Sequence, residues 1–305
     1  MAFPWLLIVS LLLICLHGMS QSIQSQEPEF ECVDIYKQPS LQHPKLKNHR
    51  IQMRPSDEVL AMLSTDASLE NLSKDEAVAE FDIPKERCPG GQVPIHKPRK
   101  SNYTEKRFHP NGYGTIGQHA ALIHKTEGTP WRGASAWISV YQPKVTPYQL
   151  SLVLIWLKSE YKNKRNTIQI GWGDPKTQNW LLTNGKTYIG YWPGELLPYL
   201  KGGAEQVRYG GFTNAQTENL QPFDIVSPPM GNGNKPLDEE VDLKHTCYMH
   251  FVKYVTPDYK RVDINSNIVI EDADFTECYD VNYLDNFGSH RQTFTFGGPG
   301  GICDV

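Results

Sequence analysis

The chain has 305 residues, 39% of them hydrophobic, which is enough to bury a core in one large or two modest domains. Its formal net charge of −4 lacks the basic excess that binds nucleic acid, so we expect no nucleic-acid partner. The 24 Gly and 22 Pro, with seven Trp and fifteen Tyr, favour a loop-rich, all-β protein over a helical bundle.

Residues 1–20 are expected to be a signal peptide. The apolar run from Leu6 to Leu16 is too short to span a bilayer. Small or polar residues near Gly18 and Ser20 suit signal-peptidase cleavage. The residues before the apolar run include no Lys or Arg, although a signal peptide usually begins with a positive charge. The alternative is therefore that the run stays uncleaved as a membrane anchor. We expect a secreted, extracellular protein with no membrane contact after cleavage.

Five cysteines remain once Cys15 leaves with the leader, and an odd number leaves one unpaired in a secreted chain. Their spacing does not give the connectivity. None has the C-x-x-C spacing of a zinc or redox site, so we expect no metal and no cofactor. They are Cys32, Cys88, Cys247, Cys278 and Cys303.

Residues 21–102 differ in character from the rest of the chain. Residues 32–56 carry five Lys or Arg against one Asp, whereas residues 57–86 carry nine acidic residues against two Lys. Ser73 and Glu76 form a capping box that predicts a short helix. The Pro, Lys and Arg residues at 94–100 indicate a linker.

Two sequons are candidate glycosylation sites in this part of the chain. They are Asn71-Leu-Ser and Asn102-Tyr-Thr, both in segments that we expect to be exposed.

From residue 103 to residue 305 the chain reads as a series of short strands. Alternating apolar and polar residues, separated by Gly, Pro or charge clusters, favour antiparallel sheets in a sandwich or barrel. The expected strands lie in HAALIHK, GASAWISVYQP, QLSLVLIWLK, NTIQIGW, KTYIGYWP, HTCYMHFVKYV and RQTFTFGG. Gly171, Gly173, Asp174 and Pro175 are expected to turn the chain.

Four phrases in this region resemble one known family. NTIQIGW, DPKTQNW, IGYWP and RYGG, in that order, resemble the catalytic domain of neprosin, the plant glutamic peptidase family. The resemblance implies an all-β fold, an antiparallel two-sheet β-sandwich, with its active site on the concave face of one sheet. It also implies that residues 21–102 are an activation peptide, which would cover the cleft until it is removed in acid.

The resemblance implies two catalytic glutamates, in the patterns N-x-I-E-x-G-W and G-G-E, and neither is present here. The corresponding positions hold Gln169 and Phe212. A glutamine can exchange hydrogen bonds but has no titratable proton, and phenylalanine has neither property. The family's glutamic dyad is two carboxyl groups that share a proton across the substrate. Some fungal glutamic peptidases work with a Gln and a Glu, so Gln169 alone would not abolish catalysis, but Phe212 occupies the place of the Glu partner. We therefore expect impaired catalysis.

Three nearby acids are alternative candidates for the missing carboxyl groups. Glu195 follows a Pro-Gly turn and Glu218 lies in a polar run, so both are expected to be solvated. Glu205 precedes Arg208 by three residues and is expected to pair with it.

The chain is also shorter than the family pattern between Trp172 and Asp174. By this alignment, roughly fifty or more residues with their own strands are absent there. Missing strands would leave sheet edges open unless a turn closes the gap. A natural short form and a faulty exon assignment both remain open.

Two function classes follow from the sequence. The first is a secreted glutamic endopeptidase that acts near proline, by resemblance only. The second is a non-catalytic β-sandwich that binds an extended peptide or cell-wall polymer through aromatic side chains, whose alternative role is core packing. The cleft candidates are Trp172, Trp180, Tyr191 and Trp192.

The resemblance implies a disulfide between Cys278 and Cys303, because both cysteines lie in the C-terminal part that matches the family. Cys32 with Cys88 is the second expected pair, and Cys247 is the expected free thiol.

Overall fold

The structure is a computed structural model. It describes residues 30–64, 88–97, 115–126, 128, 130–146, 149–162, 164–169, 171–185, 187–216, 225–237 and 241–303. They divide into two compact units, one within Met1–Leu41 and Asp82–Asn102, the other within Gln42–Phe81 and Tyr103–Val305.

The first unit holds a two-stranded sheet. β1 (Phe30–Asp34) pairs antiparallel with β2 (Gln92–His96), and the Cys32–Cys88 disulfide joins its two segments. The prediction of a linker at residues 94–100 is therefore wrong in part, because residues 94–96 belong to β2 and pair with β1.

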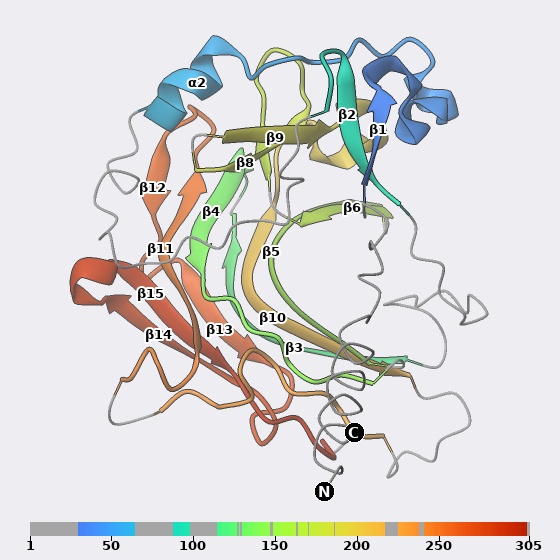
Figure 1. The fold of residues 1–305 in the computed structure, drawn as a ribbon. Helices are drawn as coiled ribbons and strands as arrows, with labels where there is room; N and C mark the ends of the chain where they lie inside the picture. Colours follow the sequence, from blue (N-terminus) through green and yellow to red (C-terminus); the bar gives the residue numbers. More distant parts are fainter. Residues whose placement is uncertain are drawn as a thin grey trace, which may run out of the picture. The chain divides into compact units, whose positions relative to one another are not determined.

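The second unit contains two antiparallel sheets, as expected for a β-sandwich (Figure 1). The five-stranded sheet has the spatial order β13 (Val269–Ala273), β3 (Thr115–Lys125), β10 (Gln206–Gln216), β5 (Gln149–Tyr161) and β6 (Lys164–Gln169). The eight-stranded sheet has the order β14 (Asp280–Asn286), β15 (Gln292–Gly297), β11 (Cys247–Val255), β4 (Gly133–Ile138), β7 (Gly171–Gly173), β8 (Trp180–Asn184) and β9 (Thr187–Trp192), with β12 (Arg261–Asp263) paired to β11.

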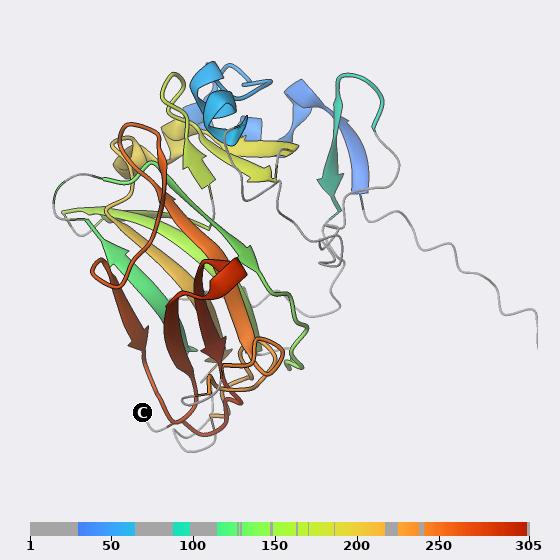
Figure 2. The same ribbon diagram turned by 90° about the vertical axis from the view of Figure 1, so that its left-hand side faces the viewer.

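The core of this unit lies between the two sheets, where every second residue of each strand faces inward. Figure 2 shows the sheets as two layers. The five-stranded sheet contributes buried Leu122, Ile155 and Tyr209 to one cluster, and the eight-stranded sheet contributes Met249 and Phe294. In Figure 1 the long strands β5 and β10 bend, with their concave side turned away from the eight-stranded sheet.

The sequence predicted one strand over NTIQIGW, but the structure has two strands there. β6 ends at Gln169 and pairs with β5, whereas β7 begins at Gly171 and pairs with β4 of the other sheet. The turn after Gly173 closes a hairpin, because Trp172 pairs with Leu181 of β8. The short junction at residues 172–174 is thus accommodated by a sheet change followed by a tight hairpin.

One α-helix, α2 (Asp57–Ser64), lies in the described part of the N-terminal segment. Short 3₁₀ turns occupy Ile35–Lys37, Pro39–Gln42, Pro44–Leu46, Gly194–Leu196, Pro198–Leu200 and Gly288–His290. The helix expected after Ser73 and the sequons at Asn71 and Asn102 lie outside the described residues, as does the expected leader. Within the described ranges, no helix has the length and apolar character needed to cross a membrane.

The expected cysteine pairing is confirmed. Cys278 and Cys303 form a disulfide, as do Cys32 and Cys88. Cys247 is a buried free thiol on β11.

Candidate active-site face and segment-docking site

The concave face of the five-stranded sheet carries an apolar row. Leu152, Leu154 and Trp156 alternate on β5 with core residues such as Ile155, so they face away from the core. The ring of Trp156 meets the ring of Phe212 on β10 edge to face, with 6.5 Å between centroids. Aromatic and aliphatic side chains on an open sheet face give a surface on which an extended chain can lie.

The two positions expected to hold the catalytic carboxyl groups are far apart. Gln169 pairs with Trp156 on one side of β5, whereas Phe212 pairs with Leu152 on the other. Strands lie about 4.8 Å apart and rise about 3.3 Å per residue. Two strand spacings and four residues therefore separate their Cα atoms by on the order of 15 Å.

The glycines before Phe212 have a packing role. A Cβ on Gly210 would lie 2.2 Å from the backbone oxygen of Ala120, and a Cβ on Gly211 would lie 2.2 Å from the sulfur of Met230. Strand packing thus accounts for both glycines of the RYGG phrase.

A charge-balanced cluster lies beside Phe212. His119 Nε2 lies 2.8 Å from Asp272 Oδ2, and His119 Nδ1 lies 2.6 Å from Asp274 Oδ2. Arg208 Nη1 lies 3.2 Å from His119 Nε2. Burial alone lowers the pKa of His119, but the hydrogen bonds to both carboxylates outweigh it, so the pKa lies above its usual range. These contacts tie the loop after β13 to β3.

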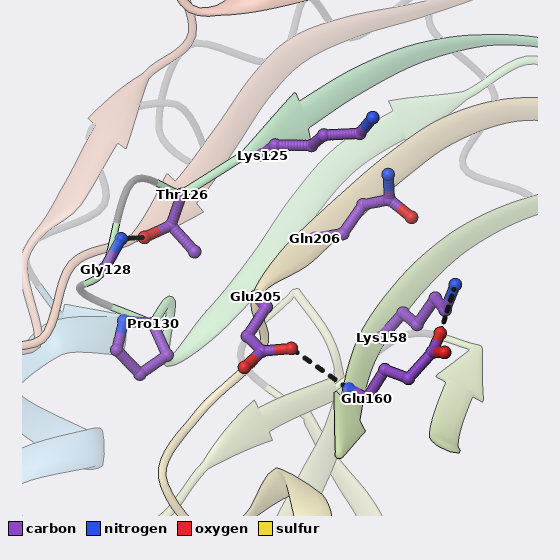
Figure 3. Close-up of a pocket in the computed structure, with 8 residues that line it drawn as sticks. All are labelled: Lys125, Thr126, Gly128, Pro130, Lys158, Glu160, Glu205 and Gln206. Atoms are coloured by element: carbon purple, nitrogen blue, oxygen red, sulfur yellow. Dashed lines mark hydrogen bonds and ion pairs between the residues drawn. The ribbon is translucent and has the colours of Figure 1, made fainter. Parts of the chain in front are cut away.

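A hollow of about 450 Å³ opens at one end of β5 and β10 (Figure 3). It contains two carboxyl groups, those of Glu160 and Glu205. The backbone N–H of Glu160 donates to Glu205 Oε2 at 3.0 Å, and Lys158 Nζ lies 3.1 Å from Glu160 Oε2. Glu205 therefore contacts the backbone of Glu160, where the sequence led us to expect an ion pair with Arg208.

The four aromatic residues expected in a cleft lie on the eight-stranded sheet, whereas positions 169 and 212 lie on the five-stranded sheet. Trp180 and Trp172 have exposed fractions of 2% and 5%, so both are buried in hydrophobic clusters, which is the core-packing role that the sequence offered beside a cleft. Trp192 is half-buried against the main core cluster. Tyr191 contacts the N-terminal segment described next.

Residues 43–64 dock on β7, β8 and β9. The imidazole of His49, which is 4% exposed, lies 2.9 Å from Glu195 Oε1 and 2.7 Å from Tyr191 Oη. Burial would raise the pKa of Glu195, but the hydrogen bond from His49 outweighs it, so the pKa is lowered.

A second anchor is Asp174, which is 1% exposed. Its Oδ2 accepts from the Ser56 N–H and from Gln52 Nε2, both at 2.9 Å, and its Oδ1 accepts from the N–H groups of Lys176 and Thr177. Burial would raise the pKa of Asp174, but these hydrogen bonds outweigh it and lower the pKa.

Helix α2 completes the docking with apolar contacts. Val59, Met62 and Leu63 face Trp172 and Leu181 in a second core cluster. The sequence did not predict this site. DPKTQNW stood out as a turn and as one of the family phrases, but no local pattern indicates that Gln52 and Asp174, 122 residues apart, would meet.

Two family models match different parts of the chain. The family model described as neprosin matches residues 172–299, and the model described as neprosin activation peptide matches residues 22–120. The first range covers strands β8 to β15 with the Asp174 turn, and the second covers the docked segment.

Proposed function

This chain belongs to the neprosin family, and from that premise we propose that it is a secreted, non-catalytic member that binds an extended peptide on its concave face. The observation that carries this proposal is the pair of positions 169 and 212. They hold no carboxyl group, and the sheet order separates them.

Loss of catalysis follows from the chemistry that a glutamic dyad requires. Two carboxyl groups share a proton only when they lie a few ångströms apart. Because β5 lies between β6 and β10, glutamates restored at Gln169 and Phe212 would remain apart. The double variant Gln169→Glu, Phe212→Glu is therefore expected to hydrolyse a quenched proline-containing peptide no faster than the parent at about pH 3 to 5. Turnover near that of an intact family member would refute the proposal.

Peptide binding is supported by the apolar row on β5 and by the Trp156–Phe212 contact. An extended chain places alternate side chains on a sheet face, where aromatic rings contribute a large contact area. Arg208 and Lys158 flank this row and would pair with acidic groups of the ligand.

The binding test uses a fluorescein-labelled proline-containing decapeptide and fluorescence anisotropy. Trp156→Ala and Phe212→Ala should each weaken binding at least tenfold, since each removes part of the aromatic floor. Tyr161→Ala, an exposed position at the end of the same strand, is the matched control. Unchanged affinity in Trp156→Ala would exclude this face, and binding of a soluble cell-wall glycan instead of the peptide would favour the polymer.

A peptidase is the second candidate function, because Glu160 and Glu205 line one hollow. If they form the acid–base pair, either Gln substitution should reduce peptide turnover by at least 10²-fold. The control is Glu195→Gln, which removes a carboxylate that contacts His49 instead. Activity that survives both substitutions, or no activity in the parent protein, rules out this pair.

Secretion and glycosylation are further parts of the proposal. The apolar leader and the two disulfides support an oxidising compartment. Expression in plant cells should deliver the protein to the medium without residues 1–20. Glycosidase treatment should reduce its mass, and Asn71→Gln or Asn102→Gln should each remove one glycan.

A further inference from the structure

The Asp174–Asn179 turn holds the side chain of Gln52 at every polar atom of its amide. Gln52 Nε2 donates to Asp174 Oδ2 at 2.9 Å. On the other side, Gln52 Oε1 accepts from Thr177 Oγ1 and from Asn179 Nδ2, both at 2.8 Å. The remaining Nε2 hydrogen reaches the backbone oxygen of Arg54 at 3.1 Å.

The direction of these hydrogen bonds is fixed before Gln52 arrives. The Gly194 N–H donates to Asn179 Oδ1 at 3.0 Å, so the amide nitrogen of Asn179 must face Gln52 as a donor. Asp174 is held as an ionised acceptor by the N–H groups of Lys176 and Thr177. The turn therefore presents an acceptor on one side and donors on the other.

Only a primary carboxamide matches this arrangement. A glutamate in the same place would set a carboxylate oxygen against Asp174, and a lysine would leave the donors of Thr177 and Asn179 without an acceptor. A buried donor or acceptor left without a partner is costly, which gives such sites high selectivity.

The backbone of the bound residue is held as well. Tyr191 Oη accepts from the Gln52 N–H at 3.1 Å, and Tyr188 Oη donates to the Gln52 carbonyl at 3.4 Å. Both tyrosines lie on β9, and His49 packs against Tyr191 with 5.6 Å between ring centroids. A short stretch of polypeptide is thus bound through its main chain, with one side chain recognised.

We propose that the Asp174–Asn179 turn and β9 form a glutamine-recognising peptide subsite, which Gln52 occupies in cis and which a glutamine-containing peptide occupies in trans when the segment is displaced. The subsite lies on the eight-stranded sheet, so the inference is independent of binding on the concave face.

The test uses the full chain with Gln52→Ala, which removes the carboxamide from the subsite, together with His49→Ala and Leu63→Ala, which remove two other contacts that hold the segment in place. The probes are labelled peptides with the sequence of residues 47–56. One peptide carries Gln at the central position, and the others carry Glu or Ala. The Gln peptide should bind at least tenfold more tightly than either, as measured by fluorescence anisotropy. Equal binding of the Gln and Glu peptides, or no binding of any of them, would overturn the proposal and leave Gln52 as a structural contact only.

Two further variants, both made on this same triple variant, separate recognition from misfolding. Thr177→Val removes one donor to the side-chain oxygen of the bound residue, at an exposed position, and should weaken binding of the Gln peptide at least threefold. The side chain of Lys176 lies on the same turn but contacts Glu58 instead, so Lys176→Ala should leave binding of the Gln peptide unchanged. Circular dichroism checks that both variants fold. Trp156→Ala should leave binding of the Gln peptide to the subsite intact. If the Gln peptide does not bind while the decapeptide still binds the concave face, only this inference is rejected.

Discussion

At the scale of single residues, the ionised carboxylate of Asp174 is an anchor for the docked segment, so docking depends on the protonation state of this group. It accepts four hydrogen bonds, two of them from residues 52 and 56 of the segment. Folding lowers the pKa of Asp174. Its stabilising contribution is therefore complete above the pKa of an unfolded aspartate, near 3.9, and is lost as the pH falls through the lower folded value.

We predict that Asp174→Asn lowers the free energy of unfolding by about 2 kcal/mol at pH 6, because hydrogen bonds to a charged acceptor are replaced by weaker ones. The difference between variant and parent should shrink as the pH falls below about 4. Urea denaturation followed by tryptophan fluorescence measures both. A difference that stays constant down to pH 2 would show that the charge of Asp174 does not contribute.

Cys247 gives a second prediction at the residue scale. Burial raises the pKa of its thiol to about 12, with only partial compensation by the hydrogen bond from Ser139. Since the thiolate is the reactive form, the folded, leader-free protein should not react with a thiol reagent such as DTNB at pH 8. One thiol per chain should appear in guanidinium chloride. Rapid labelling of the native protein would mean that β11 opens readily.

At the scale of elements, α2 illustrates how a short helix depends on its contacts. Eight residues are too few for stability in isolation. The helix is held by Val59, Met62 and Leu63 against Trp172 and Leu181, and by the ion pair between Glu58 and Lys176 on its exposed side.

We predict that Leu63→Ala weakens docking of α2 by about 2 kcal/mol, the lower end for a buried leucine. Leu60→Ala, on the same helix but 39% exposed, should change docking by less than about 0.5 kcal/mol. Hydrogen exchange of the amides in residues 57–64 at pH 7 distinguishes the two. Equal effects would mean that the apolar face does not hold the helix.

At the scale of the whole molecule, the disulfides and the docked segment determine what a single cut can release. Cys32–Cys88 lies entirely before residue 97, and Cys278–Cys303 lies entirely after it. Neither of these two disulfides therefore crosses a cut between residues 97 and 100, whereas the contacts of residues 43–64 with β7, β8 and β9 do.

We predict that limited trypsin treatment cuts first at residues 97–100 and leaves a resistant β-rich fragment. The two pieces should separate on a non-reducing denaturing gel but elute together in gel filtration at pH 7. Asp174→Asn combined with Leu63→Ala should allow them to separate in gel filtration too. A first cut inside residues 130–200 would mean that the sandwich is less stable than its burial suggests.

The sequence alone determined the fold class and the family. Alternation of apolar and polar residues is local, so strands such as β5, β11 and β15 could be predicted from their own residues. The phrases around Gly210 and Asp174 identified the family, and the resemblance gave the Cys278–Cys303 disulfide. The burial of Trp172 and Trp180 was only one of two alternatives, because an aromatic residue in a strand fits a core or a cleft equally well.

Only the tertiary structure decided where the functional positions lie. The change of sheet between Gln169 and Gly171 and the insertion of β5 between β6 and β10 separate positions 169 and 212. The meeting of Gln52 with Asp174 likewise joins residues 122 positions apart. Strand order and register depend on pairing between distant segments, and the periodicity of a single segment carries no information about which partner it will have.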